Sequence, residues 1–182
     1  ILEDLGVKIL SQKEAGITAD IVEDGTTFEE NALIKATGIA EAAKAIPGYE
    51  DAVVLADDSG LEIDHLNKEP GIYSARYMGE DTSYDIKNQA LLDRLEGVAD
   101  EHRTARFVCA IAAAFPDGRT EVVRGTMEGI IGHEILGENG FGYDPIFYLP
   151  EYGCTSAQLS PEKKNALSHR GEGLRKMREI LR

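Results

Sequence analysis

Disulfide-forming residues, basic residues and long apolar runs are all scarce in this sequence of 182 residues. Its two cysteines, Cys109 and Cys154, cannot build a disulfide framework. The 19 lysines and arginines are outnumbered by 33 acidic residues, and the formal net charge is −14. This balance argues against a nucleic-acid groove, which needs a basic footprint, and against binding to an anionic membrane surface. It still allows a phosphorylated small substrate that a metal ion and a few cations screen.

The longest apolar run, residues 108–115, is too short to cross a bilayer. The chain does not start with a basic segment followed by an apolar one, so its first residues do not resemble a signal peptide. We therefore expect a cytoplasmic protein with no membrane partner and no nucleic-acid partner.

Apolar patterning and turn signals alternate along the chain without repeats, low complexity or a linker. A chain of this length fits one domain, or one domain with two lobes. Helix caps and strand patterns together predict an α/β protein with a mixed sheet. The expected elements are a helix tail over 1–5, a strand over 7–10, an alanine-rich helix opened by Thr26 or Thr27 and running to about Lys44, a short strand over 52–55, a helix capped by Thr82 or Ser83, strands over 106–115 and 120–131, and a C-terminal helical region from Ser160-Pro161 to Arg182.

Two carboxylates, a hydroxyl and a glycine follow the short apolar strand predicted at 52–55, in the order Asp57, Asp58, Ser59, Gly60. Ligands of open α/β sheets bind beyond the carboxyl ends of strands. Paired carboxylates at such a place suit a hard divalent cation. The alternative interpretation is an ordinary turn after an edge strand, since Asp and Ser favour turns.

An acidic loop, residues 23–31, precedes the alanine-rich helix. Glu29 and Glu30 are explained by capping and by the helix dipole, whereas Glu23 lies outside the helix and is the better candidate ligand. Lys35 follows Asn31 by four residues and so shares its helical face. A solvated surface lysine is the alternative for Lys35.

Two further segments combine residues that could recognise a ligand. Residues 137–145 are dense in glycine and aromatic residues, which suggests backbone that must approach something flat, although a structural turn explains the same pattern. Lys164 and the sequence Ser168-His169-Arg170 offer donors to an anion or to carbonyl oxygens.

Taken together, these segments resemble the inosine triphosphate pyrophosphatase family, in the family's own order and over essentially the whole chain. The segments that carry the resemblance are residues 23–32, 35–36, 55–61, 70–77, 140–147 and 168–170. The resemblance implies an α/β fold with a mixed central sheet flanked by helices, and two lobes with a substrate cleft between them. It implies hydrolysis of XTP, ITP and dITP to the monophosphate and pyrophosphate, with Mg²⁺ or Mn²⁺ as cofactor, and a homodimer.

The resemblance also assigns roles to individual residues. Asp58 would be the general base and a metal ligand, and Glu23 a second metal ligand. Lys35 and Ser59 would face the triphosphate. The base and its neighbourhood would be recognised by Phe141, Gly142, Tyr143, Asp144, Lys164, His169 and Arg170.

One departure from the family pattern concerns the start of the chain. The family opens with a strand and a Ser/Thr-x-Asn-x-x-Lys loop that grips phosphates, and residues 1–182 contain no such loop. We therefore expect a single domain over 1–182 without this segment, and two alternatives stay open: the sequence as given omits the segment, or the protein lacks it. Two rival functions remain open at this stage, an aspartyl-phosphate phosphatase and a non-catalytic nucleotide-binding protein.

Overall fold

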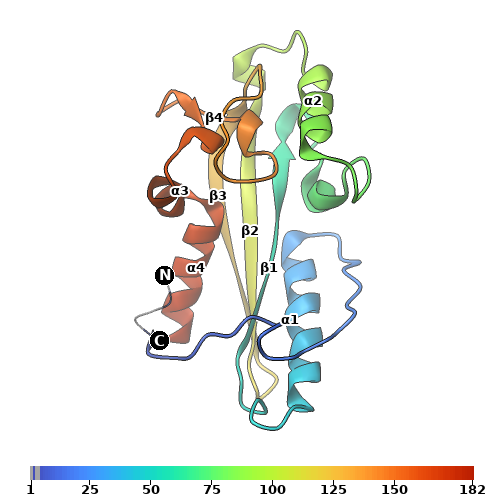
Figure 1. The fold of residues 1–182 in the computed structure, drawn as a ribbon, viewed down its shortest axis with the longest axis vertical. Helices are drawn as coiled ribbons and strands as arrows, with labels where there is room; N and C mark the ends of the chain where they lie inside the picture. Colours follow the sequence, from blue (N-terminus) through green and yellow to red (C-terminus); the bar gives the residue numbers. More distant parts are fainter. Residues whose placement is uncertain (1, 3–4) are drawn as a thin grey trace. The chain divides into compact units, whose positions relative to one another are not determined.

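The computed structural model describes residue 2 and residues 5–182 (Figure 1). These residues form two compact units, which we describe separately. The first unit comprises residues 1–58, 109–125 and 170–182, and the second comprises residues 59–108 and 126–169. The helix tail expected over 1–5 lies partly outside the described residues. No helix in the described part of the chain is long and apolar enough to cross a membrane.

Helix α1 (Phe28–Lys44) of the first unit begins and ends where the sequence predicts. The side chain of Thr27 accepts a hydrogen bond from the amide of Glu30 at 3.0 Å. The carboxylate of Glu30 accepts from the amide of Thr26 at 2.6 Å. This pair of bonds satisfies amides at the helix start that have no partner within the helix. The buried residues of α1 are Phe28, Asn31, Ala32, Ala36, Ile39 and Ala43.

Strand β2 (Thr104–Ala114) supplies both units with core residues, because its residues 104–108 belong to the second unit and its residues 109–114 to the first. In the first unit, Cys109 and Ile111 pack with Met177 of helix α4 (His169–Leu181). Gly173 allows this approach, since a Cβ there would lie 3.1 Å from Ile111 Cδ1. In that unit, α1 and α4 lie on opposite sides of the strands (Figure 1).

The sheet has the strand order β1-β2-β3-β4-β5. A turn at 115–119 joins β2 to β3 (Thr120–Ile131), where the predicted strand lies. Strand β4 (Phe147–Leu149) pairs antiparallel with β3 and with β5 (Cys154–Thr155). The predicted α/β class, a central sheet flanked by helices, is confirmed. The sheet is antiparallel, whereas a mixed sheet was predicted.

The second unit has a core built from β1, β2, β4 and helix α2 (Tyr84–Arg94), with Leu61, Ile63, Leu91, Phe107 and Phe147 among its buried residues. Ser83 caps α2 and Ser160 caps α3 (Pro161–Leu167), as predicted. Short 3-10 helices cover Asp64–Leu66, Gly71–Arg76, Asp100–His102, Asp144–Ile146 and Ser156–Gln158.

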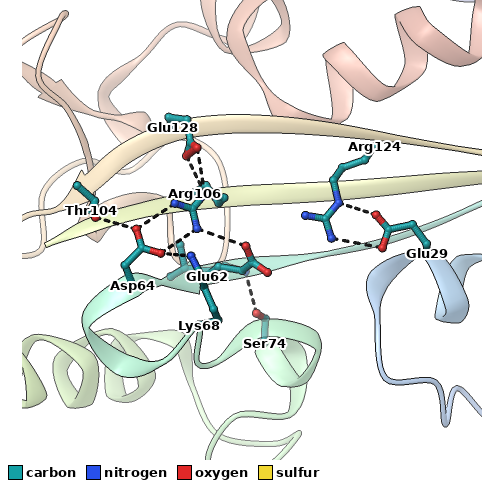
Figure 2. A network of polar contacts seen from close by, with 10 residues as sticks. Glu29, Glu62, Asp64, Lys68, Ser74, Thr104, Arg106, Arg124 and Glu128 are labelled. Atoms are coloured by element: carbon teal, nitrogen blue, oxygen red, sulfur yellow. Dashed lines mark hydrogen bonds and ion pairs between the residues drawn. The ribbon is translucent and has the colours of Figure 1, made fainter.

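A charged network covers part of the sheet face in the second unit, around Arg106 (Figure 2). The Arg106 guanidinium donates to both oxygens of Asp64, at 3.0 and 2.9 Å. It also contacts Glu62 on β1 and Glu128 on β3. A long arginine with only 18% of its side chain exposed therefore links three strands through their carboxylates.

Two predicted elements differ from the structure. Strand β1 runs from Val54 to Ile63, so the predicted strand over 52–55 was placed too early and ended too soon. Asp57, Asp58 and Ser59 are residues of the strand and do not follow it, because pairing of β1 with β2 overrides their turn preference. Residues 7–10 form no strand; Val7 and Ile9 are exposed, so no packing holds them in one.

Candidate functional site

Asp57 and Asp58 point to opposite faces of β1, because successive side chains of a strand alternate. The structure accordingly gives them different surroundings. Asp58 contacts Asn31 of α1, and Asp57 contacts Arg170 of α4. The two carboxylates therefore do not form the side-by-side pair that the sequence suggested for a metal ion.

The carboxylate of Asp58 is half-buried and only partly satisfied. It accepts a hydrogen bond from the side chain of Asn31. Its Oδ2 atom is buried and has no hydrogen-bond partner among the described residues. Burial is the largest cause that raises the pKa of Asp58, to about 6; the Asn31 bond and the charge of Lys35 oppose the rise, and the charges of Glu23 and Asp57 add to it.

Asn31 is oriented by the loop before α1. Its Oδ1 accepts a hydrogen bond from the amide of Gly25 at 2.8 Å, which leaves the NH₂ group to donate to Asp58. Gly25 is needed for this approach, since a Cβ there would lie 2.8 Å from Asn31 Oδ1 and 2.7 Å from Glu30 Cβ. Asn31 was matched to the family motif in the sequence but given no role there. Its spacing of four residues from Lys35 was the available signal.

Lys35 links the acidic loop to β1. Its Nζ lies 3.1 Å from Glu23 Oε1 and donates to the main-chain oxygen of Asp57 at 2.7 Å. Lys35 is thus held by named partners and is not a freely solvated lysine. Glu23, which faces Lys35 and repels Asp58, and Asp58 itself are the two carboxylates of this unit that could share a cation.

Arg170 and Asp57 form an ion pair of 3.1 Å in the same unit. The thiol of Cys109, on β2, lies 3.9 Å from the same Asp57 oxygen. From the sequence, Asp57 was considered only as one of two neighbouring carboxylates suited to a cation, because nothing in the sequence shows that the two aspartates would meet different helices.

The glycine-rich loop of the second unit is held together by Asp144. This buried carboxylate accepts from the amide of Phe141 at 2.9 Å and from the hydroxyl of Ser156 at 2.6 Å, and it pairs with Lys164. Gly140 packs against the ion pair with a φ of 73°. Asp144 therefore braces the loop with its side chain.

Phe141 and Tyr143 in this loop differ in exposure. Phe141 is 67% exposed, and the Lys164 ammonium lies 5.0 Å from the centroid of its ring. Tyr143 is buried; its hydroxyl donates to the main-chain oxygen of Ser74 at 2.5 Å. Burial raises the pKa of the Tyr143 phenol above its usual range. Its ring also meets Tyr84 edge-on, so Tyr143 supports the loop from within.

Gly142 has a φ of 63°, and its carbonyl accepts from Asn88 of α2 at 3.2 Å. His169 is nearly buried in the second unit, where its ring stacks on Phe107 at a centroid distance of 5.0 Å. Ser59, half-buried, follows Asp58 on β1 and belongs to the second unit.

The predicted site residues therefore fall into two groups. The first unit brings together Glu23, Lys35 and Asp58, and it also contains Arg170. The second unit brings together Phe141, Asp144 and Lys164, and it also contains Gly142, Tyr143, His169 and Ser59. His169 and Arg170 are adjacent in sequence but belong to different units.

Comparison with known proteins gives consistent matches. The model of the Ham1 family matches residues 1–180. A dITP/XTP pyrophosphatase of Clostridium perfringens is 47% identical over 182 residues, covering 100% of this chain and 89% of that protein. The dITP/XTP pyrophosphatase of Bacillus subtilis is 45% identical over 181 residues, 88% of its length.

Solved structures that resemble this one also include Ham1 proteins. A HAM1 protein from Coxiella burnetii superposes with a TM-score of 0.87 at 42% identity, over 99% of this chain and 88% of that one. The Ham1 protein of Staphylococcus aureus superposes with a TM-score of 0.79 at 48% identity, over 89% of this chain and 80% of that one.

Proposed function

This chain belongs to the Ham1 family, and we propose that it hydrolyses the non-canonical purine nucleoside triphosphates XTP, ITP and dITP to the monophosphate and pyrophosphate. The names of relatives that share 45–47% of its sequence, dITP/XTP pyrophosphatase, support this substrate class. The site geometry supports the reaction type. The single observation that carries the proposal is the buried Asp58 Oδ2, which lacks a hydrogen-bond partner within the described residues.

A buried carboxylate oxygen without a donor is costly unless something positive binds it. Among the described residues no three His, Cys, Asp or Glu side chains gather as a metal cage. Mg²⁺ does not need one, because it keeps several waters and takes one or two carboxylates plus substrate phosphates. Asp58 with Glu23 fits that donor set, with Mn²⁺ as a possible substitute. When bound, the ion supplies charge neutralisation at phosphate oxygens.

Asp58 is also suited to accept the proton of the attacking water. A general base works best with a pKa near the operating pH, and burial raises the pKa of Asp58 to about 6 in the protein without a metal ion. The water adds to phosphorus as its proton passes to Asp58, and the bond between the α- and β-phosphates breaks. Hydrolysis of a phosphoanhydride needs positioning and charge neutralisation more than covalent help from the protein.

Lys35 and Ser59 would hold the triphosphate. Lys35 is fixed by Glu23 and by the Asp57 carbonyl, so its ammonium enters the reaction already oriented. Ser59, next to Asp58, would add a hydroxyl to a phosphate oxygen.

The loop of the second unit would recognise the base. Phe141 is exposed and can stack on a purine, while Asp144 and Tyr143 hold the loop in shape and Gly142 contributes backbone. Lys164, His169 and Arg170 would offer donors to the 6-oxo group of hypoxanthine or xanthine. Adenine presents a 6-amino donor there, and a mismatch of buried polar groups gives high discrimination.

The test is release of pyrophosphate from ITP, XTP and ATP with Mg²⁺. We expect ITP or XTP to exceed ATP at least about 100-fold in kcat/KM. His169→Ala should lower that ratio more than it lowers kcat for saturating ITP. Equal kcat/KM values for ATP and ITP would contradict the proposed base recognition, and orthophosphate as the product would favour the phosphatase alternative.

A cytoplasmic setting and a homodimer complete the proposal, and both follow from the resemblance and composition alone. Sedimentation of the native protein at several concentrations tests the second. A single species with the mass of one chain would contradict it.

A further inference from the structure

The ion pair between Asp57 and Arg170 has not been given a role so far. It joins strand β1, which carries Asp58, to helix α4, which carries Arg170. Asp57 precedes Asp58 on β1 but faces α4. Its carboxylate meets Arg170 at 3.1 Å, and its carbonyl holds Lys35 at 2.7 Å. One residue thus contacts both cations of the first unit that are proposed to meet the substrate.

We infer that Asp57 is a positioning residue whose carboxylate orients the Arg170 guanidinium for the substrate. The inference rests on the proposed function, in which Arg170 is a substrate contact. It assigns different roles to the two neighbouring aspartates. Asp58 serves the water and the metal on one face of β1, and Asp57 serves Arg170 on the other.

The position of Arg170 in α4 indicates that helix stability is not the reason for its charge. Arg170 is the second residue of α4, in the first turn. A cation there is repelled by the positive end of the helix dipole. The carboxylate of Asp57 supplies the compensating anion from another element, so the pair fixes a guanidinium where the helix alone would disfavour it.

The carboxylate of Asp57, which holds Arg170, is more rigid than a typical surface carboxylate. Asp57 lies within β1 rather than on a loop, and its oxygen also contacts the thiol of Cys109 at 3.9 Å on the neighbouring strand. An aspartate has few rotatable bonds, so it restricts the long arginine more than it is itself restricted. Holding Arg170 before substrate arrives reduces the ordering cost that binding would otherwise carry.

The experiment is a double-mutant cycle with ITP as substrate. Asp57→Asn keeps size and removes the charge, and it should raise KM for ITP about 3- to 10-fold while kcat stays within about 2-fold. In the Arg170→Ala background, Asp57→Asn should raise KM no further, because its effect passes through Arg170. Asp57→Glu, which keeps the charge and shifts it by one methylene, should recover part of the loss.

Glu172→Gln is the matched control. Glu172 forms a 3.0 Å ion pair with Lys176 on the same helix, and its side chain is 39% exposed against 43% for Asp57. We expect its KM and kcat to equal those of the wild type. Thermal melts of every variant separate a loss of folding from a loss of positioning, and Asp57→Ser, which also removes the charge, repeats the cycle should Asp57→Asn not fold.

The outcomes are distinguishable. An equal KM increase for Asp57→Asn in both backgrounds, or a fall in kcat with KM unchanged, overturns the inference while wild-type hydrolysis of ITP leaves the proposed function standing. A wild-type protein that releases no pyrophosphate from ITP or XTP refutes the proposed function, and the inference falls with it.

Discussion

Replacing Asp58 by asparagine should remove activity and at the same time stabilise the protein without metal. Burial raises the pKa of Asp58 from 3.8 to about 6. At 1.36 kcal/mol for each unit of pKa, the ionised carboxylate costs the folded state up to about 3 kcal/mol. Asp58 is only half-buried, so solvent screening reduces this to about 1–2 kcal/mol. For a chain of this size the melting temperature of Asp58→Asn should rise by roughly 3–6 °C.

The increase in stability caused by Asp58→Asn should depend on pH in a defined direction. An acid whose pKa is raised by folding contributes stability below its unfolded pKa, and that stability is lost as pH rises through the folded pKa. Wild type and Asp58→Asn should therefore melt alike near pH 4 and differ fully above about pH 7. Mg²⁺ should reverse the order, since at 100 times its Kd a ligand of the native state adds about 2.7 kcal/mol, and only the wild type retains the carboxylate.

The assay is a series of thermal melts between pH 4 and pH 8, with and without Mg²⁺, alongside hydrolysis of ITP. Loss of general-base help alone predicts a fall in kcat of about 10²- to 10⁴-fold. Asp20→Asn, at an exposed position of the same unit, controls for removing one negative charge from a chain of net charge −14. A stabilisation of Asp58→Asn that is absent at pH 8, or equal at pH 4 and pH 8, would refute the argument from burial.

Two further predictions concern the second unit. Asp64→Asn should lower the unfolding free energy by about 1–2 kcal/mol at pH 7, because its carboxylate accepts two charged hydrogen bonds from Arg106. Arg106 is the first cause that lowers the pKa of Asp64, so this stability is present above the unfolded pKa of about 3.9 and is lost as pH falls; melts at pH 3 and pH 7 that show the same difference would contradict it. Gly140→Ala should destabilise the protein and raise KM for ITP, since its φ is 73° and a Cβ there would meet the Asp144–Lys164 ion pair. Gly153→Ala, with a φ of 63° and nothing within 4 Å of a Cβ, isolates the cost of backbone strain of about 1–3 kcal/mol, and equal effects of the two glycine variants would rule out the ion-pair contribution.

The sequence predicted the helix starts best, because capping is local. Thr27, Ser83 and Ser160 each accept a hydrogen bond from an amide three residues ahead. The residues that decide these starts lie within one turn of each other. No distant part of the chain is needed to recognise them.

The segment around Asp58 was singled out from the sequence, but its geometry was not predicted. Asp, Ser and Gly are poor strand residues and good turn residues, and the strand was therefore ended before them. Pairing with β2 extends β1 through them to Ile63. Once they lie in a strand, alternation separates Asp57 from Asp58, a consequence that residue preferences alone do not reveal.

The loop at 140–144 shows a second kind of limit. Its glycines and aromatics suggested backbone that approaches a flat ligand, with a structural turn as the alternative, but they did not show which side chain has which role. Asp144 is held by Ser156 and Lys164, and Tyr143 by the carbonyl of Ser74, 69 residues away. Which side chain braces the loop and which remains exposed depends on these long-range partners.

The ionisation of Asp58 illustrates why a site cannot be reduced to its motif. Asn31 and Lys35 lower its pKa, Glu23 and Asp57 raise it, and burial exceeds them all. The contributions of Asn31, Lys35 and Glu23 depend on how α1 and its loop pack against β1, and Asn31 is itself set by a single bond from Gly25. With one oxygen bonded and the other buried without a described partner, the carboxylate is less stable than it could be. A carboxylate that lowers the stability of the fold in this way is expected of a base and cation ligand and not of a residue that holds the fold together.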